Sequence, residues 1–340
     1  MIKLPARIYV ENPMPASATK PNRFASFAWA VLAFNLLVIV WGAYVRATGA
    51  GAGCGDHWPL CNGEVVPEAP GVKTVVEFTH RLTSGLALLL VVGLFAWARR
   101  AYPARHAVRR AAALSLVFIV VEALIGAGLV LLKLVADNAT VWRAVYLSVH
   151  LVNTFILVAV LALTAWWASV GEPRWTEARG ALGRHAWGVL LATLALGVSG
   201  AVAALGATLF PGSGAEELTR GDLTPAARLM FSLRQYSLHP LLAVAVGGYA
   251  VAFAVWARRA SPSGRAARWS KATVWLVAAQ MLAGLVNVAL LAPVWLQLAH
   301  LLLADLLWIA LVLLAATALS EESAAEADAR AVLAAEASVS

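Results

Sequence analysis

Eight long apolar runs constrain this chain more than any other feature of its sequence. Each is long enough to cross about 30 Å of hydrocarbon, which takes roughly 20 helical residues. Because backbone groups in lipid must be satisfied internally, we expect helices rather than strands. Hydrophobic residues make up 61% of the chain and charged residues only 13%, which excludes an ordinary soluble domain. The runs cover about residues 26–48, 76–98, 110–132, 141–168, 185–209, 229–256, 272–292 and 294–318.

The net charge of +8 follows from where the basic residues lie. Of the 26 lysines and arginines, 18 lie in the two terminal segments and in alternate connections between the apolar runs. These segments all fall on one side of the membrane. The positive-inside rule therefore predicts a multi-pass protein of the cell membrane with both termini in the cytoplasm. The membrane topology accounts for the excess of lysine and arginine, so this excess does not indicate a nucleic-acid-binding protein.

The only two cysteines, Cys54 and Cys61, lie in the first predicted outer loop. The outer side of a cell membrane is oxidising, so disulfides persist there. The six residues between them include Gly55 and Pro59, which allow a tight ring. A disulfide is the favoured interpretation. The alternatives are a metal site that includes His57, or two free thiols.

An internal duplication relates the two halves of the chain. Residues 42–49 resemble 200–206, and residues 122–126 resemble 280–284. We therefore expect an all-α integral membrane protein whose eight transmembrane helices form two tandem, pseudo-symmetric four-helix bundles. Because four spans separate equivalent elements, both halves have the same orientation in the membrane. The predicted parts are a cytoplasmic segment (1–25), an N-terminal bundle (26–170), a C-terminal bundle (171–320) and a solvated cytoplasmic tail (321–340).

Four of the seven histidines lie inside apolar runs, on the second and fourth helices of each half: His80, His150, His239 and His300. An ionisable residue at membrane depth is costly and marks a functional site by default. One such histidine could equally be a hydrogen-bonding core residue, but four at duplicated positions favour heme. Imidazoles on facing helices can ligate heme iron from both sides. A copper or zinc site would need more ligands than the sequence supplies nearby.

Arginines stand near the outer helix ends of the histidine-bearing spans. Guanidinium groups pair well with carboxylates, so these arginines are candidate contacts for heme propionates. The alternative is that each one extends to the membrane interface. The arginines are Arg81, Arg143, Arg228 and Arg234.

The two halves differ in one chemical respect. Glu77 precedes His80 by three residues, whereas Tyr236 stands three residues before His239. Residues three apart share a helix face, so we expect Glu77 to project toward the cavity of the His80 ring. A carboxylate there can accept a proton or stabilise positive charge; alternatively, it is an interfacial residue at a helix N-terminus. The asymmetry predicts a reacting site in the N-terminal bundle and a structural or electron-transfer heme in the C-terminal bundle.

Two more carboxyl groups, Glu122 and Asp305, stand at membrane depth. Each could relay protons, or could remain protonated and bond a neighbouring helix. Asn153, one turn from His150, is expected to hydrogen-bond between helices.

Residues 42–51, residues 54–63, the motif Glu77-x-x-His80-Arg81 and the duplicated histidines together resemble the heme A synthase family. The resemblance spans all eight runs and omits the tails. It implies oxidation of a heme O ring methyl to the formyl group of heme A, through an alcohol stage, for terminal oxidase assembly. It also implies a disulfide in the first outer loop, as in bacterial members with a cysteine pair there.

The resemblance also implies roles for the membrane histidines and for Glu77. It places the substrate heme between His80 and His150, makes Glu77 the catalytic carboxylate, and has His239 and His300 ligate the iron of a bound heme b. The implied partners are heme O, membrane lipid, an unidentified electron acceptor, heme O synthase and terminal oxidase assembly factors.

The chain departs from the family pattern in its second half and at one position of the third span. Residues 236–240 lack the usual His-Arg pair, the second half lacks a second cysteine pair, and Glu122 stands where the family usually has Gln. The alternative function is a non-catalytic diheme b-type membrane electron carrier. It accounts for the four histidines but not for a carboxylate and a cysteine loop in one half only.

Overall fold

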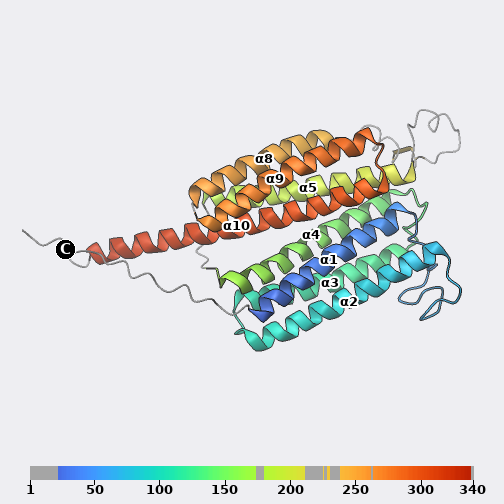
Figure 1. Ribbon diagram of the computed structural model, residues 1–340, viewed down its shortest axis with the longest axis horizontal. Coiled ribbons are helices and arrows are strands. Elements are labelled where there is room, and N and C mark those ends of the chain that lie inside the picture. Colours follow the sequence, from blue (N-terminus) through green and yellow to red (C-terminus); the bar gives the residue numbers. More distant parts are fainter. Residues whose placement is uncertain are drawn as a thin grey trace, which may run out of the picture.

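The computed structural model describes residues 22–173, 180–210, 225, 228–229, 238–261 and 263–337, with side chains as far as Ser320. Within these ranges the protein is all-α, and its eight long helices are each long and apolar enough to span a membrane, as predicted (Figure 1). They are α1 (Arg23–Ala47), α2 (Val72–Ala101), α3 (Ala107–Leu131), α4 (Val141–Val170), α5 (Ala181–Leu209), α8 (His239–Ala260), α9 (Gly264–Ala289) and α10 (Val294–Ala337).

Capping side chains explain where three of the helices begin. The Asn22 side chain accepts hydrogen bonds from the first backbone N–H groups of α1. The His106 ring does the same for α3, and the Ser263 hydroxyl for α9. These side chains satisfy N–H donors that have no partner within the helix. Arginines in the last turns of α2 and α8 interact favourably with the negative ends of the helix dipoles.

Helix boundaries differ clearly from the prediction at three places, one of which is the start of α9, at Gly264 instead of near residue 272. The sixth run was expected to begin near residue 229, with His239 about ten residues inside it, but α8 begins at His239 itself. Pro240 stands in its first turn, where the missing N–H costs nothing. At the other end of the chain, α10 continues to Ala337 through the segment expected to be a solvated tail. That segment is rich in alanine and glutamate, which are strong helix formers.

The helices pack as two neighbouring groups, one of α1 to α4 and one of α5, α8, α9 and α10, with α4 and α10 at the boundary (Figure 1). α10 is the most enclosed of the spans, with 72% of its most apolar window buried. One face of it, including Trp308 and Val312, joins the core of the first group, while Leu311 and Leu314 join the core of the second. The Trp308 indole N–H donates to the Phe155 carbonyl of α4 at 2.7 Å. This arrangement is compatible with tandem bundles, although their pseudo-symmetry stays a prediction.

Candidate functional site

The first histidine of each half lies against a glycine of the preceding helix. A Cβ atom added to Gly42 of α1 would lie 2.9 Å from Cε1 of His80 in α2. A Cβ on Gly200 of α5 would lie 2.9 Å from Cε1 of His239 in α8. Real Cβ atoms essentially never come this close to another heavy atom, so each ring occupies space that only glycine leaves free.

The second histidine of each half also has a glycine neighbour, which is tight at His300 and an ordinary van der Waals contact at His150. A Cβ on Gly284 of α9 would lie 3.1 Å from Cε1 of His300, and one on Gly126 of α3 would lie 3.9 Å from Cε1 of His150. All four glycines belong to the duplicated sequence segments. The duplication identified these glycines, but their contact with the histidines became visible only in the fold.

The ring nitrogens have the properties expected of buried ligands. Nδ1 of His80, His150 and His300 is buried without a hydrogen-bond partner, whereas Nδ1 of His239 lies 2.9 Å from the Ser199 hydroxyl. A buried nitrogen without a partner is costly unless a ligand or water bonds the ring.

The duplication of the sequence pairs His80 with His150 and His239 with His300. No group of three or more His, Cys, Asp or Glu side chains gathers around a metal-sized space in the described part of the chain. A donor set of two imidazoles fits heme, because the porphyrin supplies the remaining iron ligands.

The third helix of each group contacts the second histidine of that group. Glu122 of α3 places Oε1 3.5 Å from Nε2 of His150, and Gln280 of α9 places Nε2 3.2 Å from Nε2 of His300. The Glu122 carboxylate also accepts hydrogen bonds from Asn153, at 2.6 Å, and from the Thr154 hydroxyl of α4. The structure therefore shows Glu122 bonding a neighbouring helix and confirms the interhelical role expected of Asn153.

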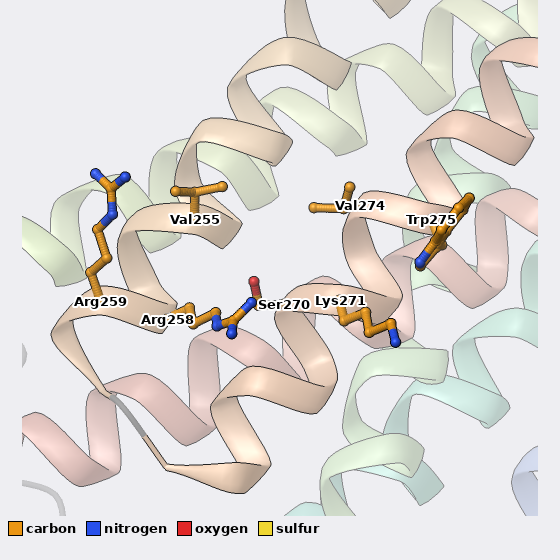
Figure 2. Close-up of a pocket in the computed structure, with 7 residues that line it drawn as sticks. All are labelled: Val255, Arg258, Arg259, Ser270, Lys271, Val274 and Trp275. Atoms are coloured by element: carbon orange, nitrogen blue, oxygen red, sulfur yellow. The ribbon is translucent and has the colours of Figure 1, made fainter.

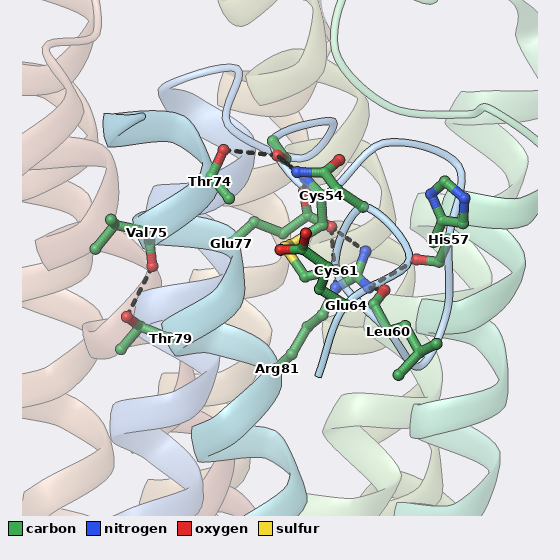
Figure 3. The surroundings of a disulfide bond; sticks show 12 residues. Cys54, His57, Leu60, Cys61, Glu64, Thr74, Val75, Glu77, Thr79 and Arg81 are labelled. Carbon is green, nitrogen blue, oxygen red and sulfur yellow. Dashed lines mark hydrogen bonds and ion pairs between the residues drawn. A yellow bond between two sulfur atoms is a disulfide. The ribbon is translucent and has the colours of Figure 1, made fainter. Parts of the chain in front are cut away.

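Glu77 is buried under the first loop, one turn before His80 on α2 (Figure 3). One carboxylate oxygen accepts a hydrogen bond from the Cys54 backbone N–H at 2.8 Å. The other accepts from Arg81, at 3.1 Å from Nε and 2.5 Å from the nearer terminal nitrogen. The carboxylate is therefore held by the loop on one side and by a guanidinium on the other.

The loop is itself closed and tied to α2. Cys54 and Cys61 form a disulfide, as predicted, which overrules the alternatives of a metal site and free thiols (Figure 3). The Arg81 guanidinium donates to the carbonyls of His57 and Leu60, both at 2.7 Å. The Thr74 hydroxyl of α2 donates to the Gly53 carbonyl at 2.8 Å. These bonds hold the disulfide ring over the N-terminal end of α2, next to Glu77.

Two of the arginines expected to contact propionates bind protein oxygens in the structure. Arg81 bonds Glu77 and the loop carbonyls, and Arg143 bonds the carbonyls of Ala136 and Asn138. Arg228 is exposed, and Arg234 and Tyr236 lie outside the described residues. Propionate binding by any of them stays a prediction.

Arg46 is a site residue whose partners could not be found from the sequence. It ends α1, yet its guanidinium donates to the Ala204 carbonyl at 3.0 Å and the Thr208 hydroxyl at 2.9 Å on α5, and to the Gln297 side chain at 3.2 Å on α10. Gln297 stands three residues before His300. Arg46 thus joins the two helix groups, and one of its partners lies one turn before His300 on α10.

Asp305 of α10 is fully buried, and neither of its carboxylate oxygens has a hydrogen-bond partner. It shares a helix face with Trp308 and Val312, which pack on the first group. The carboxyl group therefore lies toward the boundary between the two helix groups.

Comparison with known proteins assigns a family to this arrangement. Residues 25–312 match COX15-CtaA, the family of cytochrome oxidase assembly proteins. The chain belongs to this family. The match extends from the first apolar span into the eighth, and it confirms the resemblance to heme A synthases.

The relatives of this chain carry two different names, and they align with different shares of it. A Thermus thermophilus protein named protoheme IX farnesyltransferase is 54% identical over 88% of this chain and 49% of its own length. The chain thus spans about half the length of that relative. A heme A synthase of an Exiguobacterium species is 31% identical over 55% of this chain and 60% of its own, and one of Bacillus mycoides is 43% identical over 32% and 35%.

Proposed function

We propose that this COX15-CtaA protein is a heme A synthase of the cell membrane. It would oxidise a ring methyl of heme O to a formyl group and so supply heme A for terminal oxidase assembly. The observation that carries the proposal is Glu77, a buried carboxylate one turn from His80, in a chain that otherwise places matched histidine–glycine pairs in both halves. The first half thus has a reactive group that an electron carrier does not need.

The two histidine pairs have different roles in this proposal. His80 and His150 hold the iron of the substrate heme, and His239 and His300 hold heme b, which supplies one-electron chemistry when bound. The unpartnered ring nitrogens and the glycines against the rings support both sites. The two pairs belong to the N-terminal (26–170) and C-terminal (171–320) parts proposed from the duplication.

Glu77 is proposed as the proton acceptor for the methyl oxidation. Conversion of a methyl group to a formyl group with water as the oxygen source releases four protons and four electrons, so a base near the ring edge assists it. Arg81 and the Cys54 N–H restrict the carboxylate to one orientation, which is what a positioned base requires. The electrons pass to an acceptor of unidentified chemistry.

The same proposal includes the orientation of the chain. The basic connections favour cytoplasmic termini, which puts the disulfide loop on the outer, oxidising side. The substrate heme O then comes from a heme O synthase, and the product passes to oxidase assembly factors. The Thermus relative has about half its length outside the match, so its printed activity can reside in that other half.

The test uses the full chain in cells that make heme O but have no heme A synthase of their own. Extracted hemes are analysed by mass spectrometry, because methyl-to-formyl conversion adds one oxygen and removes two hydrogens. Heme A supports the proposal. Unchanged heme O together with protein-bound heme b would instead identify a diheme electron carrier.

A second strain tests whether the chain has the farnesyltransferase activity that is named for the Thermus relative. This strain lacks heme O synthase and makes only heme B. Appearance of heme O on expression of the chain would show prenyl transfer and overturn the proposal, whereas the expected result is heme B alone.

A further inference from the structure

A basic pocket lies between the end of α8 and the first half of α9 (Figure 2). Its volume is about 430 Å³. α8 begins at His239 and is 22 residues long, which is roughly 33 Å. The pocket lies at the C-terminal end of this helix. The pocket is therefore at the membrane surface opposite the histidine sites. The residues used below are Val255, Arg258, Arg259, Ser270, Lys271 and Trp275.

Three cations of the pocket have no anionic partner. Arg258, Arg259 and Lys271 are exposed, and none of them makes a hydrogen bond or an ion pair with the described part of the chain. In Figure 2 the Arg258 side chain extends from α8 toward Ser270 of α9, so that a guanidinium lies between the two helices. Three unpaired donors of positive charge around one concavity fit an anion with several oxygens, such as a phosphate ester.

The wall of the pocket is apolar and continues onto the lipid-facing surface. Val255 is 39% exposed and Trp275 is 67% exposed, although both lie on membrane-spanning helices. Trp275 follows Lys271 by one helical turn toward the middle of α9. Tryptophan is enriched where the hydrocarbon meets the headgroups. A ligand here would meet cations at one end and an apolar surface at the other.

The duplication supplies an internal comparison. The sequence Trp-Ala-Arg-Arg-Ala ends α2 at 97–101 and ends α8 at 256–260. In α2 the Arg99 guanidinium lies over the Phe95 ring of its own helix, 5.7 Å from the centroid. Gln280 and Glu122 are equivalent positions in the two halves and lie 158 residues apart. At the same offset, the first half has alanine at the positions equivalent to Ser270 and Lys271, and valine at the position equivalent to Trp275. Only the second half adds a third cation and an aromatic side chain to the repeated arginines.

We propose that this pocket binds the headgroup of an anionic phospholipid. The phosphate lies among Arg258, Arg259 and Lys271, and an acyl chain follows Val255 and Trp275 into the bilayer. Basic pockets between helices at a membrane surface bind anionic headgroups in this way. The apolar wall favours a lipid over free phosphate, because free phosphate gains nothing from Trp275.

The experiment measures lipid retained by the purified full-length protein, using native mass spectrometry. The probes are phosphatidylglycerol and phosphatidylcholine of the same acyl chains, each added in a titration. We expect a bound phosphatidylglycerol and weaker retention of phosphatidylcholine. The double variant Arg258→Gln/Lys271→Gln should weaken phosphatidylglycerol binding by about 25-fold, from about fivefold for each cation lost.

Two further variants test whether the lipid binds at this pocket and not elsewhere on the protein. Arg99→Gln/Arg100→Gln removes the same charge from the repeated motif of α2 and should leave this bound lipid in place. Arg258→Lys/Lys271→Arg keeps the charge and should retain it, which excludes misfolding as the cause of a loss. Equal losses in both charge-removing variants, or no loss in the pocket variant, would overturn the proposal. So would displacement of the lipid by inorganic phosphate at comparable concentration, since the site would then be one for the free anion.

Discussion

The Glu77 carboxylate accepts a hydrogen bond from the backbone N–H of Cys54 at 2.8 Å, and Cys54 is half of the disulfide that closes the first loop. The proposed base is therefore linked to the only disulfide of the described chain through a single hydrogen bond. Arg81 makes the second link, because it binds Glu77 and two carbonyls of the same loop. The position of the carboxylate depends on the closed loop as well as on α2.

Replacement of the proposed base should stop the reaction without emptying the heme b site. Glu77→Gln can still accept a hydrogen bond from Cys54, but it cannot take up a proton, so heme A production should fall by at least about 100-fold. Heme b per protein, read from the absorbance spectrum, should not change. Glu68→Gln, in the exposed part of the loop, is the matched control and should be active. Normal turnover in Glu77→Gln would remove this residue from the mechanism.

Opening of the disulfide should affect the same reaction through the position of Glu77. Cys54→Ser/Cys61→Ser should lower the stability of the loop by about 2 kcal/mol, as for a short closed ring. We expect a lower melting temperature and a lower rate of heme A formation, with the heme b content retained because its proposed ligands, His239 and His300, lie on other helices. If the variant keeps its full rate, the hydrogen bonds of Arg81 and Thr74 hold the loop by themselves.

The glycines against the histidines should be intolerant of alanine. Gly200→Ala would force the His239 ring out of its place, because the added Cβ would lie 2.9 Å from Cε1. Heme b content should fall, whereas Gly42→Ala should reduce binding of heme O in a spectroscopic titration. Gly93→Ala is the control, since no atom lies within 4 Å of its added Cβ, and the substitution should stabilise the helix by up to about 1 kcal/mol. Full heme b content in Gly200→Ala would contradict the proposed ligand role of His239.

The guanidinium of Arg46 should contribute to the stability of the contact between the two helix groups. Arg46→Gln removes hydrogen bonds to three acceptors on α5 and α10, and we expect a loss of about 1–3 kcal/mol. The loss should not add to that of Gln297→Ala, because the two side chains share one bond. Thermal unfolding of both single variants and of the double variant measures this coupling. Strict additivity would show that the bond contributes nothing.

The ion pair of Lys133 and Asp56 should have a small effect that depends on pH and salt. The two exposed side chains meet at 2.7 Å in the loops that follow α1 and α3, and the hydrogen bond and charge of Asp56 raise the pKa of Lys133 above its usual 10.5. A raised pKa of a cation means that its contribution is complete below pH 10.5 and is lost as the pH rises through the folded value. Asp56→Asn should lower the melting temperature slightly at neutral pH, and high salt should remove the difference. A large decrease that persists in salt would point to another role for Asp56.

Most of the fold could be predicted because lipid imposes a simple rule on the sequence. Spans must be apolar and helical, so run length alone located the eight helices to within a few residues at most ends. The rule failed at α8, where the apolar run begins well before the helix start at His239. It failed also after Ser320, where helix propensity rather than hydropathy continues α10.

The residues of the candidate site could be predicted from the sequence, but the contacts between them could not. The sequence identified Glu77 and the membrane histidines because a polar group at membrane depth is costly. It identified the cysteine pair because both cysteines lie in one loop next to a membrane span. The residues that bond Glu77 come from 23 positions earlier and from the next turn of α2, and hydropathy carries no information about such pairs.

The sequence by itself therefore determined the class of the protein, its eight spans, the duplication and the membrane histidines, since burial in lipid acts on each segment independently. Only the tertiary structure decided which glycine faces which histidine, that Arg46 of α1 binds α5 and α10, and that Arg81 is committed to Glu77 and the loop. These relationships depend on helix rotation and on the distance between side chains far apart in sequence, and packing of the whole chain sets both.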